Sequence, residues 1–179
     1  MTLSKKTTVA ALLAGLAVLL GYVEYLIPVV PPIAGMKLGL GNIAVLLALR
    51  FTASERTACG VMLTKILISA ALFSGMGGLP YSLAGGVTSF GIMAALCRMD
   101  RRRLSAAGIS AAGGAMHMAA QTAVAAWMTS TWNVLTLLPV LMGVGTLTGL
   151  LNGIIVNWME RRAGRFLTRS VRSGGDIGR

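Results

Sequence analysis

The chain has 179 residues, of which 55% are hydrophobic and only 12% are charged, and its mean hydropathy is +0.77. Soluble domains usually carry about 25% charged residues, so this chain cannot cover a globule of its size with solvated groups. The composition excludes a disordered chain and an ordinary soluble fold. It predicts an all-α, polytopic membrane protein with one transmembrane domain over residues 1–160 and a basic cytoplasmic tail over 161–179.

The charged residues are unevenly distributed. Sixteen basic and five acidic residues give a formal net charge of +11. The bases form short clusters between apolar segments rather than a basic polar surface, which argues against nucleic acid as a partner. Fourteen of them lie before the first apolar segment, in two of the connectors or in the tail, whereas the other connectors hold only Lys37. This positive-inside bias predicts a multi-pass membrane protein with both termini in the cytoplasm.

Six apolar segments are predicted to be transmembrane helices, because about 20 apolar residues cross the ~30 Å hydrocarbon layer. The second segment is short, and we expect the Pro-rich stretch before it to complete it, or the helix to tilt among its neighbours. The six segments run over residues 8–27, 38–52, 57–74, 80–99, 104–129 and 134–159.

Small residues repeat at four-residue spacing on several of these helices. Ala10 and Ala14 lie on the first helix, and Gly145, Gly149 and Gly153 lie on the sixth. Such spacing lets helix backbones approach closely in lipid. From spacing alone, two interpretations stay open, namely packing within the chain and a face for another subunit.

Polar residues inside the spans predict a pocket. Ionisable side chains in a bilayer cost several kcal/mol and usually face a cavity or a partner. Lys65 falls close to the midplane, and His117 and Gln121 lie one helical turn apart. We therefore expect a polar pocket open to the outside, and the charges of Lys37 and Lys65 suit a small anionic solute. The alternative is a structural ion pair of Glu24 with Lys65 and a hydrogen-bonded core histidine. The predicted substrate-binding residues are Glu24, Lys37, Asn42, Lys65, His117 and Gln121.

The stretch between the first two helices is apolar but irregular. Its three prolines, at positions 28, 31 and 32, exclude a regular helix there. Irregular backbone at membrane depth is tolerated only where it lines or covers a cavity. We expect a lid over the outward pocket that includes Pro31, Pro32 and Gly35, the alternative being an ordinary external loop.

The sequence lacks the signatures of a self-sufficient enzyme. It has no P-loop and no paired carboxylates for Mg²⁺. Its single histidine, His117, has no second histidine or cysteine cluster to form a metal site. We expect neither catalysis nor a bound metal or cofactor.

Residues 24–28 and 31–42 resemble the Gx transporter family, which is also labelled heptaprenyl diphosphate synthase component I. They read Glu-Tyr-Leu-Ile-Pro and Pro-Pro-Ile-Ala-Gly-Met-Lys-Leu-Gly-Leu-Gly-Asn. The similarity extends through residues 81–86 and 113–121. The family's His-Asn-x-Gly-Gln run is His117-Met-Ala-Ala-Gln121 here, and Lys65 stands where arginine is expected.

That family is similar to the substrate-binding S components of energy-coupling factor transporters. The resemblance implies six helices, a pocket capped by the first loop, and docking through Ala10 and Ala14 on a transmembrane coupling subunit. It also implies capture of a small solute from the outer face and uptake driven by partner ATPase subunits. The synthase label leaves a second hypothesis open, a non-catalytic membrane accessory subunit of isoprenoid diphosphate synthesis. A structural assembly factor without a ligand is a third.

Overall fold

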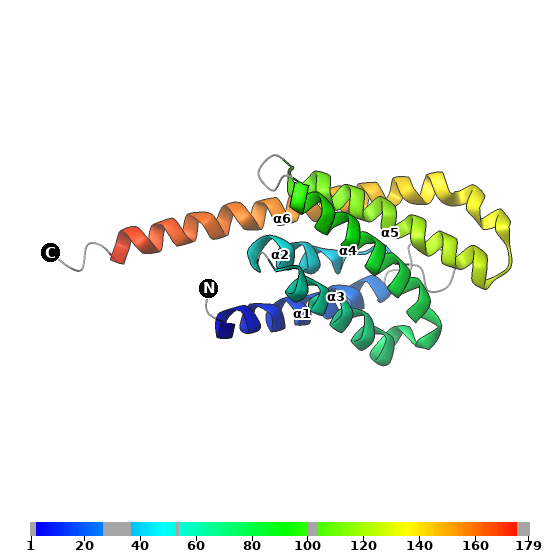
Figure 1. The fold of residues 1–179 in the computed structure, drawn as a ribbon, viewed down its shortest axis with the longest axis horizontal. Coiled ribbons are helices and arrows are strands. Elements are labelled where there is room, and N and C mark those ends of the chain that lie inside the picture. The colour runs from blue at the N-terminus through cyan, green and yellow to red at the C-terminus, as the bar shows by residue number, and fades with distance from the viewer. Residues whose placement is uncertain (1–2, 27–36, 53, 100–103, 175–179) are drawn as a thin grey trace.

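The computed structural model describes residues 3–26, 37–52, 54–99 and 104–174. Regular structure in these ranges is entirely helical, which confirms the all-α prediction (Figure 1). A π-helical turn and two 3-10 turns occupy residues 70–74, 76–78 and 132–137. The six α-helices are α1 (Leu3–Leu26), α2 (Asn42–Thr52), α3 (Glu55–Ser69), α4 (Leu79–Met99), α5 (Ala106–Met128) and α6 (Leu138–Gly174).

Four helical stretches are long and apolar enough to cross a membrane, namely Thr7–Leu26, Glu55–Ser74, Met76–Met99 and Trp132–Arg162. The α2 helix is apolar but has only 11 residues, and the 23-residue α5 is not among the four stretches. The 37 residues of α6 correspond to about 55 Å of helix. This length exceeds the ~30 Å hydrocarbon layer. The C-terminal part of α6 extends well beyond the other helices (Figure 1).

The short α2 helix lies at the centre of the bundle. It contacts all five other helices, and every residue from Asn42 to Leu49 is buried. A helix that is apolar all round belongs in a core. The second helix is shorter than predicted, because it begins at Asn42 rather than at Leu38. Gly39 has a φ of +86°, a left-handed conformation that favours glycine and cannot continue a helix.

The closest helix pair is α5 with α6. A methyl group on Gly145 would lie 2.4 Å from the Gly114 carbonyl oxygen, and one on Gly149 would lie 2.3 Å from the Ser110 carbonyl oxygen. The two backbones are thus in direct contact, as small-residue spacing permits. The glycine repeat of α6 accordingly packs within the chain.

Charged pairs gather at one end of the bundle, called here the basic end, which holds Arg50, Arg98 and Arg162. The Arg50 guanidinium donates to both carboxylate oxygens of Glu160, over 2.7 and 3.0 Å. The exposed Arg98 pairs with Glu55. The start of α1 and the end of α6 lie at this same end (Figure 1), as the predicted topology requires.

Candidate functional site

Residues Lys37–Gly41, called here the strap, run without regular structure to the start of α2. Gly39 is its fixed point. The Gly39 N–H donates to the Glu24 carboxylate of α1, and the Asn152 amide of α6 donates to the Gly39 carbonyl oxygen over 3.2 Å. Buried backbone groups outside a helix need such partners. Glu24 therefore acts as an anchor for the strap.

A second chain of hydrogen bonds joins the strap to α5. The Lys37 N–H donates to Oε1 of Gln121 over 3.0 Å, so the Gln121 NH₂ group faces Nε2 of His117 at 2.9 Å. Because that NH₂ can only donate, Nε2 accepts, and the neutral His117 ring carries its proton on Nδ1. The Nδ1 atom is buried without a hydrogen-bond partner, against the position where Gly85 of α4 lacks a side chain.

Lys65 of α3 is the central charge of the site. Its side chain is only 8% exposed, and no hydrogen bond or salt bridge of its ammonium occurs among the described residues. The direct ion pair with Glu24 that the sequence left open does not form. The Lys65 ammonium lies instead beside Gly41, where an added methyl group would be 2.6 Å from Nζ. It is therefore placed at the N-terminus of α2.

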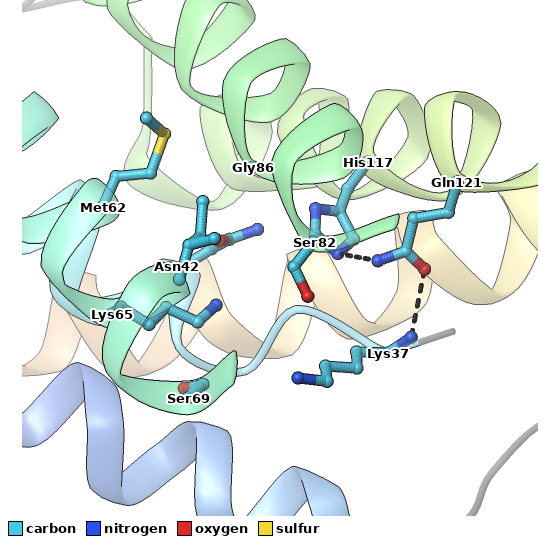
Figure 2. A pocket seen from close by; sticks show the side chains of 10 residues that line it. Lys37, Asn42, Met62, Lys65, Ser69, Ser82, Gly86, His117 and Gln121 are labelled. Carbon is cyan, nitrogen blue, oxygen red and sulfur yellow. Dashed lines mark hydrogen bonds between the residues drawn. The ribbon is translucent and has the colours of Figure 1, made fainter. Parts of the chain in front are cut away.

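A small cavity lies between the strap, α3, α4 and α5 (Figure 2). It offers about 10 Å³ to the centres of water-sized molecules, which is room for about one water. Five of the six predicted substrate-binding residues line it, and the sixth, Glu24, does not. The cavity is lined by Lys37, Asn42, Met62, Lys65, Ile66, Ser69, Ser82, Gly86, His117 and Gln121.

Three polar residues of the site were not among those predicted. Ser69 and Ser82 line the cavity, and the hydroxyls of both are buried without a hydrogen-bond partner in the part of the chain that the structure describes. Ser69 follows Lys65 by one helical turn, a spacing that places the two on one face and could have identified it. Ser82 and the strap partner Asn152 carry no comparable signal, because only the tertiary packing brings them to the site.

The predicted docking residues Ala10 and Ala14 line a second depression, between α1 and α3, called here the small-residue groove. It has a volume of about 570 Å³. Both alanines are half-buried, whereas Ala11 and Gly60 are exposed in it. The predicted lid residues Pro31, Pro32 and Gly35 lie outside the described residues. The groove is lined by Thr7, Ala10, Ala11, Ala14, Ser54, Thr57, Gly60, Val61 and Thr64.

Comparison with known protein families matches residues 13–159 to heptaprenyl diphosphate synthase component I. No curated protein and no solved structure matches the chain. Within the described ranges, no three His, Cys, Asp or Glu side chains come together to hold a metal ion. The family match spans most of the chain and every residue that lines the cavity, and together with the apolar helices it describes a multi-pass membrane protein. The chain belongs to the heptaprenyl diphosphate synthase component I family.

Proposed function

We propose that this protein is the solute-binding membrane subunit of an uptake system. It binds a small polar solute in the cavity beneath the strap, entering from the end of the bundle opposite the basic end. Partner subunits supply the ATP hydrolysis that moves the solute inward. The resemblance to S components of energy-coupling factor transporters supports this assignment.

The observation that carries the proposal is the Lys65 ammonium in a buried cavity, which has no hydrogen-bond or ion-pair partner among the described residues. A charge at membrane depth is costly unless a partner or water compensates it. Ser69 and Ser82 line the same cavity, and their hydroxyls have no hydrogen-bond partner within the described part of the chain. Buried polar atoms in native proteins are nearly always hydrogen-bonded, so such hydroxyls on two helices around one cavity favour the binding of a polar solute there.

The strap supports a role in enclosing that solute. It carries Lys37 over the cavity and leaves room for only about one water. Ligand sites usually measure about 300–1,000 Å³, so a solute must displace the strap to enter. The hydrogen bonds of Gly39 and Lys37 define the closed position.

The small-residue groove supports docking of a coupling subunit. It lies on the half of α1 that carries Ala10 and Ala14, towards the basic end, and its exposed walls are formed by small side chains. A transmembrane helix can approach such walls closely, which is the usual basis of helix association in lipid. In this proposal the cavity binds the solute and the groove binds the partner.

Two measurements test the proposal. Protein purified in detergent without ATP should retain a small molecule that mass spectrometry identifies after denaturation, and Lys65→Ala should lose it. Uptake of that molecule by cells should fail in Gly60→Leu, which fills the groove, although the purified variant still retains the solute.

Gly91→Leu is the matched control. Like Gly60, Gly91 is an exposed helical glycine with no atom near the position of an added Cβ, but it lies on α4 outside the groove. This variant should retain the solute and support uptake with its ATPase partners bound. Wild-type protein that retains no solute, or loss of uptake in both leucine variants alike, would contradict the proposal.

A second candidate function follows from the family description. A membrane accessory subunit could hold a prenyl diphosphate synthase subunit at the basic end through the arginines around residues 98–103 and 161–179. Deleting residues 163–179 should then abolish formation of the prenyl diphosphate and leave solute uptake intact. The reverse result would exclude this candidate.

A further inference from the structure

We infer that the cavity recognises a small monocarboxylate, bound through its carboxylate group by Lys65, Ser69 and Ser82. The inference rests on the proposed solute-binding function and names the chemical class of the solute. Figure 2 shows the side chains of Lys37, Lys65 and Ser82 directed toward one space beneath α4.

The unsatisfied groups around the cavity can all act as hydrogen-bond donors. Lys65 offers an ammonium, and Ser69 and Ser82 offer hydroxyls, whereas the Nδ1–H of His117 lies against Gly85 of α4. Two unsatisfied acceptor oxygens lie near the strap, Oε2 of Glu24 and Oδ1 of Asn152, and both belong to residues outside the lining. A ring of donors without a matching acceptor is complementary to a ligand rich in acceptor oxygens, and an ionised carboxylate accepts only.

The charge balance specifies a single negative charge. The site holds two lysines, Lys37 and Lys65, and one carboxylate, Glu24, so with His117 neutral its net charge is +1. One bound monoanion makes the buried site neutral, whereas a dianion would leave it negative. Because uncompensated buried charge is strongly unfavourable, the balance favours a carboxylate over a doubly charged phosphate or sulfate.

The fold adds a second attraction for an anion. The Lys65 ammonium lies beside Gly41, directly before the first residue of α2. The N-terminus of a helix carries the positive end of its dipole. Two of its first amides are already used, since Asn42 and Ile43 donate to strap carbonyl oxygens. The anion is therefore bound mainly by the side chains, with the dipole adding to their field.

Thermal unfolding of the full-length protein in detergent tests the class of solute. The probes are formate, acetate, propionate and lactate, each compared with sodium chloride at equal ionic strength, with sodium sulfate and choline chloride as the dianion and cation arms. The carboxylates should raise the midpoint of unfolding in wild-type protein. Lys65→Met should weaken their binding on the order of thirtyfold or more, because a buried charged partner is lost.

Ser82→Ala keeps the test decisive if Lys65→Met folds poorly. Removing an unsatisfied hydroxyl is nearly neutral for the ligand-free fold, so this variant should unfold like wild type yet respond less to carboxylates. Ser110→Ala is the matched control, since Ser110 is buried on α5 outside the cavity lining, and it should keep the full response.

Three results would overturn the inference. Carboxylates could leave the unfolding midpoint of wild-type protein unchanged, or could raise it as much in Lys65→Met and Ser82→Ala as in wild type. The third is a larger rise of the midpoint with sulfate or choline than with carboxylates. If purified protein still retains a solute that Lys65→Ala loses, only the class of solute is wrong. If it retains none, the proposed function itself fails.

Discussion

Replacing Gly149 by alanine should separate α5 from α6. The added methyl group would lie 2.3 Å from the Ser110 carbonyl oxygen and 2.8 Å from the Ala111 Cα. Ordinary contacts of a Cβ begin near 3.4 Å, so the helices must move apart by roughly 1 Å. Both contacts are backbone atoms and cannot rotate away, which places this substitution near the upper end, about 3 kcal/mol, of overpacking costs.

Helix propensity works in the opposite direction. Alanine is favoured over glycine in a helix by about 1 kcal/mol, so the net loss in the free energy of unfolding should be about 2 kcal/mol. Gly143→Ala on the same helix is the control, because no atom lies within 4 Å of its added methyl group. That variant should be as stable as wild type or slightly more stable, as measured by denaturant titration of the purified protein in micelles.

The same substitution should loosen the strap. Gln121 on α5 and Asn152 on α6 both hold strap backbone groups, so a change in helix spacing displaces one of them. Amide hydrogen exchange at Lys37 and Gly39 should become faster in Gly149→Ala but not in Gly143→Ala. Equal stability and equal exchange in the two variants would refute the close backbone contact.

Two further substitutions test the basic end and the strap. Glu160→Gln should lower the free energy of unfolding by about 1.5–3 kcal/mol, because the half-buried Arg50 loses a charged hydrogen-bond partner. Glu55→Gln should lower it less, because the ion pair of Glu55 with Arg98 is exposed. Equal losses for the two variants in chemical denaturation would contradict this. Gly39→Ala and Gly75→Ala share a positive φ, with a strain of about 1–2 kcal/mol each, but only Gly39 meets neighbouring side chains. Solute retention should therefore fall in Gly39→Ala alone, and an equal loss in both would show that strain is the cause.

Hydropathy located most helices well because charged or turn-forming residues flank the apolar runs. The fourth segment, predicted over residues 80–99, is observed as Leu79–Met99. The second segment shows the limit of this reasoning. Residues 38–41 are as apolar as the residues of α2. They do not belong to that helix because Gly39 has a left-handed conformation. Composition alone does not reveal that conformation.

The site was predictable where burial is expensive. Lys65 and His117 were identified because a charge or an imidazole at membrane depth requires a reason. Ser82 gives no such warning, since a hydroxyl in a helix can bond to a carbonyl oxygen of its own helix, and the sequence does not show that Ser82 lacks this bond. Glu24 was predicted to bind the solute, but it does not line the cavity and its carboxylate accepts from the Gly39 N–H, because packing decides which way a side chain points.

The hydrogen bonds of the strap predict that the cavity opens only where water can reach the strap. Glu24, Gln121 and Asn152 each hold one strap backbone group, and they come from three different helices. Inside a membrane these groups cannot be released without new partners, since each unsatisfied one costs several kcal/mol. Water or solute entering from outside provides such partners, and each exchange then changes the free energy by only about 1 kcal/mol. We therefore expect the strap to stay closed against lipid and to open towards an aqueous phase, as the proposed capture of a solute from that phase requires.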